Sequence, residues 1–369
     1  MGDDKYAKEI RKTGFVLENS VGDMLRRSGW TVISNKYYED DFEGSVREID
    51  LLAYKVSKVQ HVDVYTTMLI SCKKSDADIW ALLSRSINLK DPNSDWWPLH
   101  AWSNDKAIEY ELTKSGMAKT YHDDVIKFGV KEALSLPEYE VFAFQEMKRV
   151  DGAPHNDKNI FGAVTSLMKA QAYEIGALSH RKKKPSVYQF NLISIIASDL
   201  IRLNIDGNNI SQEVIDSEHY ISRYIIKKSE SFSRIRFVAA SRFKEKLNDY
   251  GRLHEANCKW FDNTLNAFYD EILKDYKRVN MLIDEFRSKV GWSIYWVVKQ
   301  AFGTQINREA ISLWWNKEGQ YAEVALMDDG AVVESLNRNS ELKQKISAAL
   351  KEVYRYSGEF KFAVDDIPF

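Results

Sequence analysis

The fold is decided by the stretch 46-VREIDLLAYKVSKVQHVDVYTTMLISCKK-74. Its two ends are apolar and rich in β-branched residues, and its centre is polar. This pattern predicts two strands, 46–54 and 66–73, that pair as a hairpin with its tip near 58–61. Farther along, the sequence predicts helices over 157–178 and 217–228 and strands over 188–197, 200–205 and 234–240. Helices and strands alternate up to about residue 250, which indicates an α/β core.

Charged side chains interrupt the apolar pattern of the hairpin at defined positions. Successive side chains of a strand point to opposite faces. Glu48, Asp50 and Leu52 therefore share one face of the first strand, and Ser71 and Lys73 share one face of the second. This places an acid and a base on neighbouring strands, where they can act together or form a structural ion pair.

The residues before the hairpin predict a helix over 14–27 that Gly29 ends. Its apolar stripe consists of Leu17, Val21, Met24 and Leu25. Glu18 stands on the flank of this stripe, because its separation from Leu25 is close to two helical turns. A carboxylate turned toward a core is costly unless a counter-charge, a metal or a solvent cleft compensates it. Glu18 is thus either an exposed helix acid or a partner of the hairpin's acid and base.

Glu18, Asp50 and Lys73 together suit phosphodiester hydrolysis. Carboxylates bind Mg²⁺, which polarises a phosphate. A lysine orients or helps to deprotonate the attacking water and stabilises developing charge. The sequence has no GxxxxGK[ST], GxGxxG or GxSxG motif, and its seven histidines are scattered. These observations disfavour NTPases, dinucleotide enzymes and α/β-hydrolases.

Glu18 and the segments 47-REID-50 and 69-LISCK-73 together resemble the pattern of the PD-(D/E)XK, or restriction-endonuclease-like, nuclease superfamily. In that family a helix Glu precedes a strand Asp, and (Asp/Glu)-x-Lys follows on the next strand. The resemblance implies an α/β fold with a restriction-endonuclease-like mixed sheet flanked by helices.

The resemblance also implies a set of site residues. Glu18, Asp50 and the backbone carbonyl of Cys72 would bind Mg²⁺ or Mn²⁺, and Lys73 would assist the water. Gln171, which shares the apolar stripe of the helix predicted over 157–178, would support this site, since many members of the family carry a Gln on that helix.

The chain departs from the family pattern at Ser71, which occupies the position of the second carboxylate. A hydroxyl is a neutral and weaker ligand, so metal affinity should fall unless Glu18 or Glu48 takes its place. Because the other motif residues are present, we expect an active Mg²⁺-dependent endonuclease that acts on DNA. The alternative is a catalytically inactive nuclease fold that binds nucleic acid or serves as the scaffold subunit of a complex.

The resemblance covers roughly residues 10–250. We expect this region to form the nuclease-like domain, and 251–369 to form a helix-rich domain whose role the sequence does not identify; a partner or oligomer interface is one candidate. Apolar residues recur at helical spacing over 261–286, which predicts one long helix, either packed within the chain or forming a coiled-coil dimer seam. A protein partner would have to supply any NTPase or helicase activity, and a homodimer would suit the cutting of both strands.

Charge is nearly balanced, with 52 Lys+Arg against 54 Asp+Glu. Only a local basic surface would therefore attract nucleic acid. The densest basic run consists of Arg181, Lys182, Lys183 and Lys184. Further basic residues lie between 223 and 246, among them Arg234 and Arg236. We expect these residues to hold phosphates, with solvated loops and helix faces as the alternative.

The length of 369 residues is enough for about two domains. The two cysteines, Cys72 and Cys258, fit a reducing compartment. The N-terminal segment lacks an apolar core, and charged residues interrupt the most apolar stretch, 187–205. We expect a soluble, cytoplasmic protein that does not enter the membrane. By analogy with stand-alone members of the superfamily, phage defence or restriction is the expected role.

Overall fold

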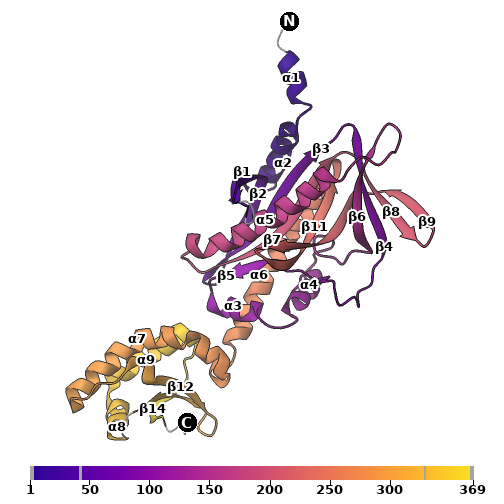
Figure 1. The fold of residues 1–369 in the computed structure, drawn as a ribbon. Helices are drawn as coiled ribbons and strands as arrows, with labels where there is room; N and C mark the ends of the chain where they lie inside the picture. Colours follow the sequence, from indigo (N-terminus) through magenta and orange to yellow (C-terminus); the bar gives the residue numbers. More distant parts are fainter. Residues whose placement is uncertain (1–3, 41–43, 328–329, 366–369) are drawn as a thin grey trace. The chain divides into compact units, whose positions relative to one another are not determined.

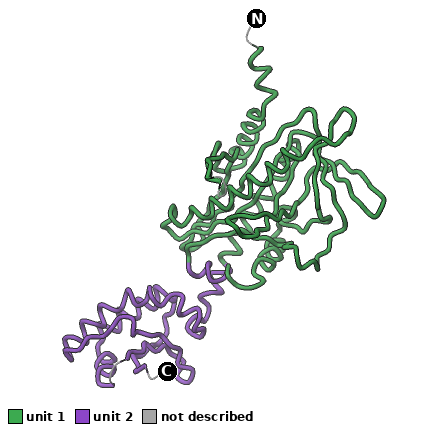
Figure 2. The backbone as a smooth tube through the Cα atoms, viewed as in Figure 1, with its two compact units in different colours: residues 1–105, 112–262 green, residues 106–111, 263–369 purple. Residues whose placement is uncertain are grey.

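The computed structural model describes residues 4–40, 44–327 and 330–365. The chain divides into two compact units, shown in Figure 2. Unit 1 comprises 1–105 and 112–262, and unit 2 comprises 106–111 and 263–369. The chain passes from unit 1 to unit 2 within helix α6 (Phe243–Tyr269), so the division falls about a dozen residues later than the boundary drawn from the sequence. Helices and strands are present in both units, as expected for an α/β protein.

Unit 1 is built on a mixed sheet with the strand order β1-β2-β3-β7-β11-β10, and β5 pairs with β7 (Figure 1). Its strands are β1 (Thr31–Glu39), β2 (Val46–Val59), β3 (Val62–Lys74), β5 (Ala101–Ser103), β7 (Ser186–Ala197), β10 (Ser217–Ile226) and β11 (Ser229–Ala239). The pairs β1–β2, β2–β3 and β10–β11 are antiparallel. The pairs β3–β7 and β7–β11 are parallel.

The predicted hairpin is confirmed, and both of its strands are longer than predicted. β2 and β3 pair from Leu51–Ile70 to Val59–Val62, with the turn at Gln60 and His61. Gln60 has a φ of 52°, the left-handed conformation that a two-residue turn requires. The polar tip extends the ladder because backbone pairing does not require apolar side chains.

Helices α2 (Phe15–Arg27) and α5 (Lys158–Arg181) contribute buried faces to unit 1. Val21 and Leu25 of α2 are fully buried. Gly29, with a φ of 77°, follows the last turn as predicted. The α5 face joins a core cluster with side chains of the sheet, and Figure 1 shows this helix lying across the strands. Members of this cluster include Ile160, Val164, Leu167, Leu52, Leu69, Phe190 and Leu192.

A second sheet of unit 1 has the order β6-β4-β8-β9. Its strands are β4 (Asp78–Ser86), β6 (Tyr139–Lys148), β8 (Leu200–Asp206) and β9 (Asn209–Val214). Helices α1 (Asp4–Ile10) and α4 (Met117–Lys127) also belong to unit 1, whereas residues 106–111 of α3 (Lys106–Leu112) belong to unit 2.

The helix predicted over 217–228 is wrong, because this segment is strand β10. It pairs with β11 through a turn at Lys227 and Lys228, whose φ values are 48° and 64°. Two consecutive left-handed residues fit the tight turn that joins twisted antiparallel strands. The apolar residues of β10 include neighbouring pairs spaced by four, which imitates the period of an amphipathic helix.

Unit 2 contains a three-stranded sheet and several helices. The sheet has the order β12 (Ile311–Asn316), β13 (Tyr321–Leu326) and β14 (Phe360–Val364), and the helices after α6 are α7 (Tyr276–Phe302), α8 (Gly330–Arg338) and α9 (Ser340–Tyr354). The prediction of a single long helix over 261–286 is wrong, because two helices, α6 and α7, share this segment. Helix α6 ends at Tyr269, and Glu271, two residues later, has a φ of 47°. Asp275 then caps the N-terminus of α7, where its side chain accepts hydrogen bonds from two backbone N–H groups.

The apolar side chains of that segment are largely buried, which supports packing within the chain over a coiled-coil seam. Those less than 9 % exposed are Phe261, Leu265, Phe268, Ile272, Val279, Ile283 and Phe286. Tyr276 is the exception, at 56 % exposed. Among the helices that the structure describes, none combines the length and the apolar character needed to cross a membrane.

Candidate active site

Asp50 lies at the point where β2 and β3 stop pairing with each other. The β2–β3 ladder ends at the pair Leu51–Ile70. Two residues after Ile70, the backbone N–H of Cys72 donates a hydrogen bond of 2.5 Å to the Asp50 Oδ2 atom. β3 continues beyond this point against β7, with Ser71 opposite Ser194 and Lys73 opposite Ile196. The Asp50 carboxylate therefore replaces a missing strand partner and is held at the splayed end of the hairpin.

Glu18 lies within electrostatic range of this strand end. Partial burial and the carboxylates of Asp50 and Glu48 raise the pKa of Glu18, and the Lys73 ammonium opposes this increase. Burial also raises the pKa of Asp50, against the hydrogen bonds from Cys72 and Ser71 and the charge of Lys73. The structure therefore brings Glu18, Asp50 and Lys73 into one electrostatic environment, as the sequence predicted.

Glu48 is oriented by a residue that the sequence analysis did not single out. Asn35 of β1 donates a hydrogen bond from Nδ2 to the Glu48 carboxylate. Asn35 has a φ of 54°, which interrupts an otherwise extended strand. An Asn inside a β-branched and aromatic run is a sequence signal for such an interruption, because Asn is depleted in strands and tolerates the left-handed region.

Cys72 is 5 % exposed and packs as a small apolar side chain. Burial and the nearby carboxylates of Asp50 and Glu18 raise the pKa of its thiol well above the usual range. The thiol is therefore protonated at neutral pH and unsuited to act as a nucleophile.

The oxygen atoms of this cluster fit a hard divalent cation of the Mg²⁺ type. The Asp50 carboxylate raises the pKa of Glu18, and the Glu48 carboxylate raises the pKa of both, which indicates negative charge that a cation would compensate. Within residues 4–40, 44–327 and 330–365, His, Cys, Asp and Glu side chains form no group of three or more arranged to hold a metal ion. Mg²⁺ typically retains several waters and takes one or two carboxylates, and Glu18 and Asp50 with the Cys72 carbonyl are the groups that would hold it.

Gln171 lies away from this cluster. Its Oε1 atom accepts a hydrogen bond from the Ser233 hydroxyl at 3.3 Å, on β11. Ser233 is two residues before Ile235, which pairs with Leu192 of β7, so Ser233 lies at the level of residue 190. Ser71 pairs with Ser194, four residues farther along β7. This register separates Ser233 from the level of Ser71 by roughly 13 Å along the strands. The helical stripe correctly placed Gln171 toward the sheet, but its partner is Ser233 rather than the carboxylates.

The basic run at residues 181–184 is at the opposite end of the parallel strands from Lys73. Pro185, which follows it, accepts a hydrogen bond from Asp63, and Asp63 is opposite Ser186. Lys73 is opposite Ile196, ten residues farther along β3, which corresponds to roughly 33 Å.

Two members of the basic run already have partners. Arg181 donates to Glu174 at 2.6 Å, and Lys182 donates to the Tyr65 hydroxyl at 3.1 Å. Lys183 and Lys184 are exposed. These two lysines are therefore accessible to a nucleic-acid backbone.

Arg234 and Arg236 were predicted to hold phosphates, but they are only 8 % and 3 % exposed. Arg234 donates to the backbone carbonyls of Ser135 and Trp96, and Arg236 pairs with Glu132. Their side chains alternate with apolar residues on a strand that is buried on both faces, so they serve the interior of unit 1. The prediction for these two residues is therefore wrong.

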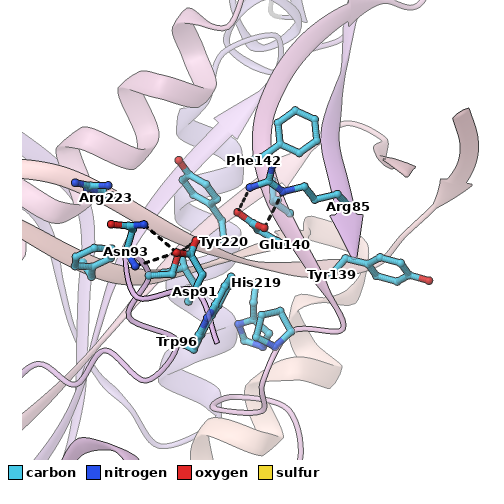
Figure 3. A pocket seen from close by; sticks show the side chains of 15 residues that line it. Arg85, Asp91, Asn93, Trp96, Tyr139, Glu140, Phe142, His219, Tyr220 and Arg223 are labelled. Carbon is cyan, nitrogen blue, oxygen red and sulfur yellow. Dashed lines mark hydrogen bonds and ion pairs between the residues drawn. The ribbon is translucent and has the colours of Figure 1, made fainter. Parts of the chain in front are cut away.

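A hollow of about 330 Å³ opens elsewhere in unit 1 (Figure 3). Arg85 forms two hydrogen bonds of 2.8 Å with Glu140 there, and Arg223 pairs with Glu230. Tyr220, another lining residue, lies at the level of Leu69 but three strands away from β3, or roughly 14 Å across the sheet. This hollow does not include Glu18, Asp50 or Lys73.

Comparison of the chain with protein-family models, with curated proteins and with solved structures found no match.

Proposed function

We propose that this protein is a metal-dependent nuclease that hydrolyses phosphodiester bonds. The observation that carries the proposal is the position of Asp50, fixed by the Cys72 N–H at the splayed strand end and electrostatically coupled to Glu18 and Lys73. A mixed sheet with helices on its faces, as the restriction-endonuclease-like superfamily has, supports the same proposal.

Each residue of the cluster has a chemical role in this proposal. Glu18, Asp50 and the Cys72 carbonyl would hold Mg²⁺ or Mn²⁺, which polarises the phosphate and lowers the pKa of a bound water. Lys73 would orient the attacking water and, as an ammonium, stabilise the negative charge that develops on the phosphate. Ser71 lowers the pKa of Asp50 by hydrogen bonding, which favours the charged carboxylate that a cation needs. DNA as the substrate and phage defence as the role follow from the resemblance to the superfamily.

A second candidate is a nucleic-acid-binding or scaffold protein on an inactive nuclease fold. Two observations favour it: Ser71 stands where a second carboxylate is expected, and the described side chains include no group of three metal-ligating residues. A partner with NTPase or helicase activity and a homodimer are compatible with either candidate.

Cleavage assays distinguish the two candidates. The purified chain is incubated with plasmid, linear DNA and RNA in Mg²⁺, Mn²⁺ or EDTA, alongside Lys73→Ala. Lys74→Ala is the matched control, because Lys74 is the next residue of β3 and donates to the backbone carbonyl of Arg11 instead. Metal-dependent cleavage that Lys73→Ala loses and Lys74→Ala keeps supports the nuclease. Nucleic-acid binding without cleavage in any metal supports the second candidate.

A further inference from the structure

A separate hollow of about 180 Å³ lies between the second half of α5 and strands β1, β2, β3 and β7 of unit 1. Its lining is mostly apolar and aromatic, with a few charged side chains. The apolar and aromatic members are Ile33, Leu52, Tyr54, Tyr65, Leu178, Tyr188 and Phe190. Concave sites of this composition, with a small number of polar groups, are typical of small-molecule binding.

The aromatic wall of this hollow is ordered by ring stacking. Tyr65 and Tyr188 stack with their ring centres 4.1 Å apart and an angle of 5° between the planes. Tyr54 lies 5.7 Å from Tyr65 at a tilt. The Lys182 ammonium lies 4.4 Å from the centre of the Tyr65 ring. The wall therefore combines closely packed aromatic rings with a cation, groups that proteins also use to bind bases and their phosphates.

Positive charge exceeds negative charge around the hollow. Its charged lining residues are Lys36, Arg181 and Lys182 against one carboxylate, Glu174. Glu174 interacts with both Arg181, at 2.6 Å, and Lys36, at 3.8 Å. Lys182 contacts the Tyr65 hydroxyl and the rings rather than a carboxylate. The surplus of positive charge favours a ligand with an anionic group.

Two side chains that line the hollow each carry a buried polar atom with no hydrogen-bond partner among the described residues. These are the Glu174 Oε1 and Thr67 Oγ1 atoms, on side chains that are 5 % and 2 % exposed. The Lys36 ammonium lies 3.8 Å from the Glu174 Oε1 atom, beyond hydrogen-bond distance, so a ligand that supplies an N–H or O–H group to this oxygen would be favoured. A fatty acyl chain would leave both atoms unpaired, and an inorganic anion would leave the aromatic wall uncovered.

We propose that this hollow binds a nucleotide. The base packs against the aromatic and aliphatic side chains, its amino or imino N–H donates to Glu174, and the phosphate is bound by Lys182 together with Lys36 and Arg181. The nucleotide is either free or part of a single strand, since both present the same groups. Binding does not depend on cleavage by the candidate active site, although Leu52 is two residues from Asp50, or roughly 7 Å along β2.

The test is titration calorimetry of the full chain with adenosine, guanosine, cytidine and uridine monophosphates and with a short single-stranded oligonucleotide. Inorganic phosphate and ribose 5-phosphate serve as controls without a base. We expect at least one mononucleotide or the oligonucleotide to bind more tightly than either control, and the stronger of the two identifies the source of the nucleotide. Equal binding of phosphate, or no binding of any nucleotide, would overturn the proposal.

Variants locate the binding site. Lys182→Ala should weaken binding about tenfold, and Lys183→Ala, at the exposed next position, should leave it unchanged. Thr67→Val keeps the shape of a buried side chain, so it should fold normally while weakening binding several-fold. Binding that neither Lys182→Ala nor Thr67→Val alters contradicts the assignment. Asp50→Ala should retain full nucleotide affinity, which separates this result from success or failure of the nuclease proposal.

Discussion

The two ends of the parallel strand pair β3–β7 have opposite electrostatic character. At the end marked by Ser71 and Lys73, the carboxylates of Asp50 and Glu18 have raised pKa values and suit a divalent cation. At the other end, marked by Asp63 and Ser186, the basic run and the stacked tyrosines suit phosphates and bases. The separation of roughly 33 Å is close to one turn of duplex DNA. In the proposed nuclease, cleavage and phosphate binding would therefore use opposite ends of this strand pair.

The largest expected difference between the two ends is in catalysis. Asp50→Ala should lower the metal-dependent cleavage rate by about 100-fold or more, because it removes a cation ligand and the group that Lys73 works beside. Initial rates on plasmid DNA measure the effect. The control is Asp76→Ala, two residues after Lys74, whose side chain is 72 % exposed and pairs with Lys74 at 3.5 Å. Equal loss in both variants would contradict a specific role for Asp50.

Removing charge from the basic end should weaken DNA binding without affecting chemistry. Lys183→Gln combined with Lys184→Gln should raise the Kd for DNA about threefold to tenfold near 0.1 M salt, and should lower the slope of log Kd against log salt by up to about 2. Fluorescence anisotropy at several salt concentrations measures both quantities. The cleavage rate at saturating DNA should stay unchanged. A fall in that rate, with the Kd unaffected, would reverse the roles assigned to the two ends.

Ser71 offers a smaller and more specific test at the acidic end. Ser71→Asp restores a second carboxylate beside Asp50 and should lower the Mg²⁺ concentration needed for half-maximal cleavage by a few-fold. Because Ser71 is 1 % exposed, a thermal melt in Mg²⁺ must accompany the assay. Ser71→Ala is the matched control and should not improve metal use. A folded Ser71→Asp variant that gains no Mg²⁺ affinity argues that the missing carboxylate is irrelevant to the site.

The smallest effect is on stability as a function of pH. Since the folded-state pKa of Asp50 is raised, the folded protein binds its proton more tightly than the unfolded chain does. Asp50 therefore contributes stability at low pH, and this contribution is lost as the pH rises through the folded pKa. Asp50→Asn should raise the Tm by a few degrees at pH 8 in EDTA, with the difference shrinking toward pH 4.

Mg²⁺ supplies the internal control for that measurement. It should raise the Tm of the wild type, because a ligand that binds the folded state stabilises it, and leave the Tm of Asp50→Asn unchanged. A Tm difference between the two proteins that is independent of pH would mean that Asp50 is not titrating in the way its surroundings indicate.

The sequence predicted the hairpin well because its information is local. Period-2 alternation identified which of Asp50, Ser71 and Lys73 share a face, and the polar segment around Gln60 identified the turn. The same local reasoning failed for 217–228, where strand residues happen to follow a helical spacing and only the pairing with β11 decides the outcome. It also failed after Tyr269, where a short break separates two helices whose apolar periods nearly continue each other.

The positions of Gln171 and of the basic run could not be predicted from local patterns. A helical stripe indicates that Gln171 faces the sheet, but its level along the strands depends on how α5 crosses them. Likewise, the distance between Lys183 and Lys73 is set by the parallel register of β3 and β7, a pairing of segments more than 100 residues apart. Such long-range registers depend on packing, which one sequence does not specify through periodicity alone.

The most direct test of the account is Mn²⁺ binding followed by electron paramagnetic resonance, since it needs no substrate and no partner. The account predicts saturable binding by the wild type, loss of that binding in Asp50→Asn, and full retention in the Lys183→Gln, Lys184→Gln variant at the other end of the strands. Equal Mn²⁺ binding by the wild type and by folded Asp50→Asn would contradict the claim that the splayed strand end is a metal-dependent active site.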